Sequence, residues 1–210
     1  MTSISGRTRA VTVGLTSLIV VGGLLTGSGA APLRVVVRDD RFDDRVVGRA
    51  VGTQVRWATA DGAENIHNVR EDSFLFDSGD PEAPPWSYTR TFSAGTFHYY
   101  CDTHGRPGGG MDGLVKVPVK ILDGPDGRPF TVQWATAGSN TGGRFNVQFR
   151  IGTGNWKAWK KGTTANKAVF GSGGRPVTVE QHKTYKFRAK SRNGIGASRW
   201  SPVKSKVVHS

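Results

Sequence analysis

Downstream of Pro32, apolar and polar residues alternate in short runs, and no stretch shows the period of about 3.6 residues that marks an amphipathic helix. Residues 144–151 (Arg-Phe-Asn-Val-Gln-Phe-Arg-Ile) alternate throughout, as a strand with one buried face does. Clusters of Gly, Pro, Asn and Asp separate the runs. The pattern predicts strands at residues 33–37, 54–58, 88–92, 95–101, 113–119, 130–134, 144–151, 184–191 and 203–208. We therefore expect an all-β chain built from sandwiches or barrels.

The clearest break between two groups of strands is the turn-rich segment 123–127 (Asp-Gly-Pro-Asp-Gly). It predicts two domains, at residues 32–122 and 123–210. Charge supports this division, because residues 32–118 contain ten basic and thirteen acidic side chains, whereas residues 119–210 contain seventeen basic and three acidic ones. The net charge of +13 therefore belongs almost entirely to the second domain.

The overall composition excludes several classes of protein. Hydrophobic residues make up 36% of the 210 residues and charged residues 21%, which is typical neither of a disordered chain nor of a multi-pass membrane protein. The single cysteine excludes an intramolecular disulfide and a metal site built from cysteines alone.

Residues 1–31 have the order of a secretory signal peptide. Arg7 and Arg9 precede an uncharged apolar run at 10–25, which small residues follow up to Ala31. The run is shorter than the roughly 20 residues that span a bilayer, so we expect cleavage near Ala30 or Ala31, with an uncleaved anchor as the alternative. The mature protein is then secreted, or located in the cell envelope or periplasm.

Cys101 lies at the end of a predicted strand, and a glycine-rich loop with His104 and Met111 follows it. Glycines permit the tight turns that would let these three side chains converge, and His67 is a fourth candidate. One thiolate, two imidazoles and a thioether form the donor set of a mononuclear blue-copper centre. Soft sulfur favours Cu(I) while imidazole suits both oxidation states, so this donor set suits one-electron transfer.

Residues 33–118 resemble a plastocyanin-type cupredoxin. The resemblance rests on the segments Gln-Val-Arg-Trp (54–57), His-Asn-Val (67–69), Phe-Asp-Ser-Gly (76–79), Tyr-Cys-Asp-Thr-His-Gly (100–105) and Met-Asp-Gly (111–113). It implies a Greek-key β-sandwich or barrel that binds one type 1 copper ion through His67, Cys101, His104 and Met111. It also implies that Asn68 braces the site through a bond to the loop after the cysteine, and that electrons pass at the ring edge of His104.

Enzymatic turnover is not expected. The chain has no His-x-His pair for the trinuclear cluster of a multicopper oxidase, and no Ser/His/Asp order or His-Glu-x-x-His motif for hydrolysis. Zinc is the competing metal, although a thioether is a poor zinc ligand. His98 alternates away from Cys101 along its strand, and we interpret it as structural.

The second domain resembles a fibronectin type III module. Trp134 fits its core tryptophan, Tyr185 fits its tyrosine corner, and residues 193–201 fit its penultimate turn. The resemblance implies a second β-sandwich, in which strands 144–151 and 184–192 are neighbours.

If those strands are neighbours, six cations share one outer face: Arg144, Arg150, Lys186, Arg188, Lys190 and Arg192. Trp156, Trp159 and the lysines at 157, 160 and 161 are expected near this face. Like charges repeating along a strand at roughly 7 Å repel one another, so an anionic envelope polymer, lipid or nucleic acid would relieve the repulsion. The alternative is a solvated basic face with no specific partner.

These interpretations together predict an exported blue-copper protein that transfers single electrons to a redox partner protein, with the basic module for docking. One alternative is an envelope protein that binds or stores copper without a redox partner. Another is an adhesion or matrix protein with a structural copper site.

Overall fold

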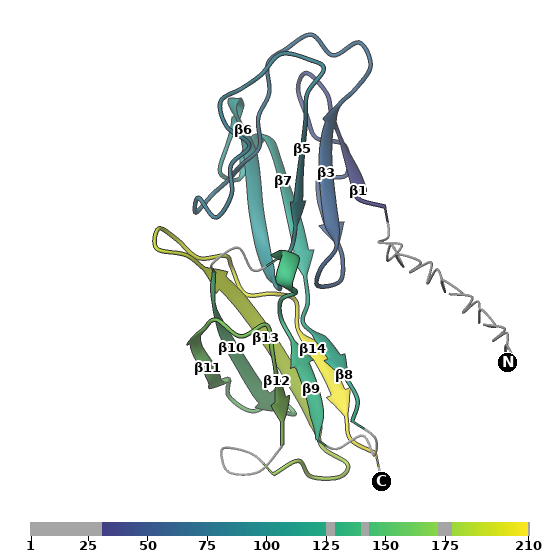
Figure 1. Cartoon of the computed structure of the whole chain (residues 1–210), viewed down its shortest axis with the longest axis vertical. Coiled ribbons are helices and arrows are strands. Elements are labelled where there is room, and N and C mark those ends of the chain that lie inside the picture. The colour runs from purple at the N-terminus through teal and green to yellow at the C-terminus, as the bar shows by residue number, and fades with distance from the viewer. Residues whose placement is uncertain (1–30, 125–128, 140–142, 172–177, 210) are drawn as a thin grey trace, which may run out of the picture.

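The computed structural model describes residues 31–124, 129–139, 143–171 and 178–209 (Figure 1). The predicted signal peptide therefore lies, apart from Ala31, outside the described residues. The described ranges contain no helix with the length and apolar character of a membrane-spanning segment. The only helical element among them is one 3-10 turn, η1 (Ala137–Ser139), so the predicted all-β fold class is confirmed.

The first group of strands forms two sheets that face each other, which we call the N-terminal sandwich. Its strands are β1 (Leu33–Val37), β2 (Val46–Gly48), β3 (Gln54–Thr59), β4 (Arg70–Glu71), β5 (Ser87–Thr91), β6 (Gly95–Arg106) and β7 (Gly109–Val117). One sheet has the order β1-β3-β5 and the other β2-β7-β6-β4. Their inner faces bury one apolar cluster that includes Trp57, Phe97 and Tyr99.

The second group forms the C-terminal sandwich. Its strands are β8 (Lys120–Leu122), β9 (Phe130–Gln133), β10 (Arg144–Ile151), β11 (Lys157–Thr163), β12 (Lys167–Phe170), β13 (Thr184–Arg192) and β14 (Lys204–Val207). The sheet orders are β12-β9-β8 and β11-β10-β13-β14. Trp134, Tyr185 and Phe187 are buried in a second apolar cluster between them.

Every strand that the alternation predicts has a counterpart in the structure, but five strands are not predicted. These are β2, β4, β8, β11 and β12. β2, β4 and β8 have only two or three residues, and β11 is an edge strand rich in lysine, so none shows a clear alternation. β8 pairs with β9, although it precedes the domain boundary predicted after Leu122, and that boundary stays a prediction.

The two sandwiches are stacked end to end (Figure 1). At their junction the Ala94 amide donates to the Trp134 carbonyl at 2.7 Å, and Thr96 and Arg199 exchange two backbone hydrogen bonds of 3.0 and 3.1 Å. Asn193 Nδ2 also donates to the Phe74 carbonyl. β6 thus begins at the junction and runs away from it, so Cys101 lies about 16 Å further along the strand than Thr96.

Candidate metal centre

The β6–β7 hairpin brings three of the predicted site residues together, because the regular pairing of its two strands is interrupted between them. Tyr100 pairs with Asp112, and the next pair is Gly105 with Gly110. Four residues of β6, Cys101 to His104, therefore lie opposite Met111 alone. The strand does not end at Cys101 as predicted, but continues to Arg106 beyond this large bulge.

The glycines of the hairpin are needed for close approach between its two strands. A Cβ atom at Gly105 would meet the carbonyl oxygen of Met111. Gly110 has a φ of +69°, and a Cβ there would lie 2.6 Å from the carbonyl oxygen of His104. The glycine-rich sequence thus forms a tight hairpin rather than an open loop.

His67 reaches the same place from a different segment. Its backbone exchanges two 2.9 Å hydrogen bonds with Glu82, and its side chain is fully buried. Its Nδ1 atom lies 3.7 Å from Cys101 Sγ, and His104 Nδ1 lies 3.7 Å from the same sulfur. The ligand atoms of His67, Cys101 and His104 are all within 4.8 Å of one another.

These distances fit three donors to one metal ion. A thiolate and an imidazole nitrogen that share an ion at about 2.3 and 2.0 Å, with an angle of about 120° between the bonds, are about 3.7 Å apart. Cys101 is a free thiol with 0% of its surface exposed, and it faces two imidazole nitrogens rather than a second cysteine. Burial, followed by the neighbouring His104, lowers the pKa of His67, which favours the neutral imidazole that binds metals.

Met111 is the fourth residue of the expected ligand set. It is buried, with 1% exposure, and belongs to the same apolar cluster as Cys101. Its register places it directly across from the bulge Cys101–His104. The position suits a weak axial thioether ligand, and that role stays a prediction.

Asn68 connects the two segments that carry the candidate ligands. Its Oδ1 atom accepts a 2.9 Å hydrogen bond from the Asp102 amide, while its Nδ2 donates to Asp102 Oδ2 at 2.7 Å and to the Gly79 carbonyl at 2.9 Å. Asp102 also forms a 3.0 Å ion pair with Arg70, which in turn pairs with Asp77. This network holds the residue after Cys101 against the residue after His67.

Asp39 was not predicted from the sequence as part of the site. Its Oδ1 atom accepts 2.9 Å hydrogen bonds from the amides of Glu64 and Asn65, which lower the pKa of this carboxyl group. The same oxygen lies 3.7 Å from His67 Nε2, the ring nitrogen that points away from the sulfur. A carboxylate beside the distal nitrogen is the usual means of orienting a metal-bound histidine.

Sequence patterns contain little that could have identified Asp39, Asp102 or Arg70. Asp102 is adjacent to Cys101, but its partners Asn68 and Arg70 are more than thirty residues upstream. Asp39 follows the first strand and approaches His67 only in the folded sandwich. His98 pairs with Leu114, outside the bulge, and takes no part in the cluster.

The six cations predicted to share a face lie on two paired strands. Arg144 pairs with Arg192 and Arg150 with Lys186, while Arg188 and Lys190 occupy the intervening positions of β13. Trp156 lies beside this face, in contact with two of its guanidinium groups. The expectation for Trp159 is wrong, because its ring packs against Trp134, Phe170 and Phe187 of the apolar cluster.

No protein-family model and no curated protein matches the sequence. Among solved structures, a reduced mutant of amicyanin is 21% identical, with a TM-score of 0.35, over 43% of this chain and 86% of that chain. The purple cupredoxin from Nitrosopumilus maritimus is 22% identical, with a TM-score of 0.34, over 40% of this chain and 98% of that chain. The Cu(I) form of another amicyanin mutant is 23% identical, with a TM-score of 0.35 and the same coverage as the first. Each of these solved structures is similar to less than half of this chain.

Proposed function

We propose that the N-terminal sandwich binds one copper ion and carries single electrons between partner proteins, and that it catalyses no turnover reaction. The observation that supports this most directly is the buried thiol of Cys101, with two imidazole nitrogens at equal 3.7 Å distances. Copper bound there would supply a one-electron redox couple that no side chain of the chain provides. His67, Cys101 and His104 would hold the ion, with Met111 as the axial ligand.

The protein's own residues would keep the site rigid and partly shielded. The Asn68–Asp102–Arg70 network positions the segment that carries Cys101. Cys101 and His67 are fully buried, whereas His104 is only partly buried. The His104 ring is therefore the ligand through which an electron would reach a partner at the surface.

We assign docking to the C-terminal sandwich, which we regard as fibronectin type III-like, and we propose that the chain is exported. In support of the module, Trp134 is fully buried and Tyr185 lies near the start of β13. The Tyr185 hydroxyl accepts a hydrogen bond from the Glu180 amide and donates to the Thr178 carbonyl, as a tyrosine corner does. The basic face of β10 and β13 would attach the protein to an anionic envelope component.

The proposal is tested by adding Cu(II) to the purified, metal-free protein and recording its visible spectrum. We expect stoichiometric binding of one ion and an intense thiolate-to-copper band. Cys101→Ser should abolish the band, and Met111→Leu, a change of similar volume, should keep copper binding but alter the band and the reduction potential. His98→Gln, which removes a nearby histidine outside the site, is the matched control and should leave both unchanged.

A colourless copper adduct, or a Cys101→Ser spectrum identical to that of the parent, would contradict the copper assignment. Voltammetry then distinguishes a carrier from a storage protein. A carrier gives a reversible one-electron wave, whereas copper that dissociates on reduction indicates storage.

A further inference from the structure

The outer face of the sheet β11-β10-β13-β14 is built from cations and tryptophans in contact. The Trp156 ring is contacted by the guanidinium groups of Arg150 and Arg188, whose Cζ atoms lie 4.6 and 4.2 Å from its centroid. The Trp200 ring is contacted by Arg188 at 4.7 Å and by Lys190 at 5.2 Å. We call these five residues the cation ladder.

The cation ladder concentrates positive charge without acidic partners. None of the ion pairs among the described residues includes a ladder cation, nor Arg144, Lys186 or Arg192 on the same face. Burial and the nearby charge of Arg150 lower the pKa of Arg188. Contact with the tryptophan rings holds the cationic side chains in place although their charges repel one another. The face is therefore ordered without a bound anion.

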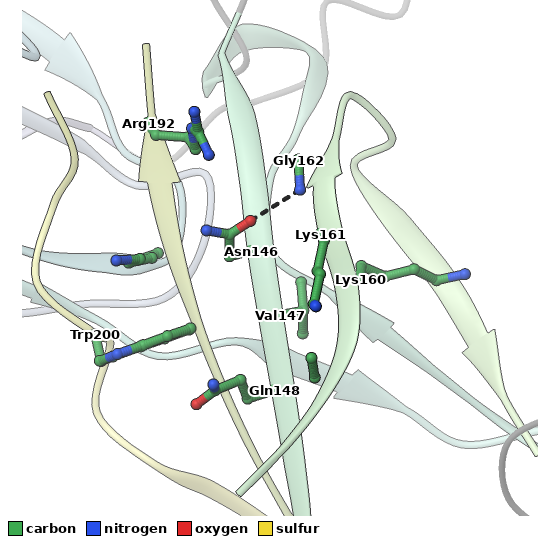
Figure 2. A pocket seen from close by; sticks show the side chains of 10 residues that line it. Asn146, Val147, Gln148, Lys160, Lys161, Gly162, Arg192 and Trp200 are labelled. Carbon is green, nitrogen blue, oxygen red and sulfur yellow. Dashed lines mark hydrogen bonds between the residues drawn. The ribbon is translucent and has the colours of Figure 1, made fainter. Parts of the chain in front are cut away.

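A pocket of about 440 Å³ adjoins the ladder (Figure 2). Its wall includes Asn146, Lys161, Lys190, Arg192 and Trp200, and no described acidic residue lines it. The volume falls within the range of about 300–1,000 Å³ that small-molecule sites occupy.

The amide groups of this region are oriented so that they present donors. Asn146 Oδ1 accepts a 2.8 Å hydrogen bond from the Gly162 amide, as Figure 2 shows. Gln148 Oε1 accepts two hydrogen bonds from Arg188, at 2.9 and 2.7 Å. Both amide oxygens thus accept hydrogen bonds from groups of the protein, and the NH₂ groups of Asn146 and Gln148 can donate to a ligand. A face of ammonium, guanidinium and amide donors suits a ligand whose exposed atoms are all acceptors.

The spacing of the cations indicates which class of anionic polymer fits this face. Lys186, Arg188, Lys190 and Arg192 occupy alternate positions of β13, about 7 Å apart. Six backbone bonds separate alternate residues of a strand, and six bonds also separate successive phosphorus atoms in a phosphodiester polymer with three carbons per link. Two extended chains with the same number of bonds per charge have closely similar repeats.

The tryptophans favour a polymer without bases. Single-stranded nucleic acids gain much of their affinity by stacking bases on aromatic rings, but here the rings of Trp156 and Trp200 already carry cations. A membrane surface would require apolar side chains that insert, and no exposed Ile, Leu or Phe lines the pocket.

We propose that the cation ladder and the adjoining pocket bind a linear phosphodiester polymer that lacks bases, such as a polyol-phosphate or sugar-phosphate chain. The proposal rests on the docking role assigned above to this sandwich, and it is independent of the metal centre. The strand supplies a row of cations in register with the phosphates, and the pocket holds one repeat unit against Asn146 and Arg192.

Binding of the full-length protein to fluorescent probes of equal charge tests the proposal. The probes are an abasic deoxyribose-phosphate 12-mer, a thymidylate 12-mer and an oligogalacturonate. We expect the abasic chain to bind within about 3-fold of the thymidylate and at least about 5-fold more tightly than the oligogalacturonate. With four phosphates neutralised, the affinity should fall about 50-fold between 50 and 200 mM salt.

Matched double variants distinguish binding at this site from attraction by the net charge of the protein. Lys161→Gln with Arg192→Gln removes two exposed pocket cations and leaves the ladder intact, and it should weaken binding by at least about 5-fold. Lys120→Gln with Lys167→Gln removes the same charge from the opposite sheet and should change affinity by less than about 2-fold.

Thymidylate binding that is 10-fold tighter than abasic binding would overturn the proposal in favour of nucleic acid. Equal or tighter oligogalacturonate binding, or equal losses in the two double variants, would overturn it in favour of unspecific charge attraction. Capture by phosphatidylglycerol vesicles without any binding of the abasic chain would point to a membrane instead. If no anionic probe binds, both the proposed docking function and this proposal are contradicted. The preceding outcomes contradict this proposal alone, because the sandwich could still dock to a different anion.

Discussion

Several side chains in the N-terminal sandwich are buried with polar groups that lack hydrogen bonds. Among the described residues these include His67 Nε2, and also Trp57 Nε1 and the Tyr99 hydroxyl, which interact without forming a hydrogen bond of normal geometry. An unsatisfied buried group costs about 1–3 kcal/mol of stability. At His67 a metal on the other ring nitrogen and the adjacent Asp39 would offset that cost, but no comparable role explains Tyr99.

Replacing Tyr99 with Phe should therefore leave stability at pH 7 unchanged or raise it by up to about 1 kcal/mol. Burial raises the pKa of Tyr99 to about 12 from its ordinary value of 10.0. The folded protein holds the Tyr99 proton more tightly than the unfolded chain does. The contribution of Tyr99 to the free energy of unfolding is therefore complete below pH 10 and is lost as the pH rises from 10 to about 12. The loss amounts to about 2–3 kcal/mol.

Urea unfolding of the parent and the Tyr99→Phe variant between pH 8 and 11.5 measures this contribution. The difference between the two proteins isolates the contribution of Tyr99 from that of every group the two proteins share. Parallel stability curves across that range would contradict the assignment.

At the scale of elements, the β6–β7 hairpin determines the geometry of the candidate metal centre. On one side of the bulge Cys101–His104, the strands approach closely because Gly105 and Gly110 have no Cβ atom. On its other side, Arg45 forms an ion pair with Asp112. A hairpin constrained on both sides of the bulge keeps the thiol and the second imidazole at a fixed separation.

Gly105→Ala should disturb this hairpin, because the added methyl group would meet the backbone of Met111 rather than a flexible side chain. We expect a loss of about 1–3 kcal/mol in unfolding free energy and weaker copper binding. Gly48→Ala is the matched control, since a Cβ there meets nothing within 4 Å and its φ is not positive.

Denaturant unfolding and competitive copper titration of both variants provide the measurement. Equal behaviour of Gly105→Ala and Gly48→Ala would show that the hairpin tolerates expansion at this point.

At the scale of the whole molecule, the candidate metal centre and the basic face lie on different sandwiches. The junction between them includes the Ala94–Trp134 hydrogen bond, backbone contacts of β6 with the segment after β13, and the turn 193–197 against residues 73–74. The metal centre is further along β6, away from this junction. An anion bound to the second sandwich would therefore leave His104 accessible to a redox partner.

Gly196→Ala tests whether the junction is a fixed contact. A Cβ at Gly196 would meet the Ser73 carbonyl in the other sandwich, whereas Gly194, in the same turn, has nothing within 4 Å and serves as the control. We expect Gly196→Ala to lower the thermal stability by about 1–3 kcal/mol and to increase the maximum dimension in X-ray scattering. Unchanged scattering and melting relative to Gly194→Ala would indicate a loose junction.

The all-β class and the positions of the long strands follow from the amino-acid sequence alone, and so does the proposal of a donor set around Cys101. These features depend on short-range patterns, because the two-residue alternation of a strand and the local motif around a cysteine are both visible in consecutive residues. β2, β4 and β8 are not predicted, because a strand of two or three residues depends on its partners rather than on its own pattern.

Only the tertiary structure brought His67 to within 3.7 Å of Cys101, placed Asp39 behind it and stacked Arg188 between two tryptophans. It also placed the Trp159 ring against Trp134 of the apolar cluster rather than on the basic face. Contacts of this kind join residues that are 12 or more positions apart in the sequence. Chain packing decides them, and no local pattern encodes the result.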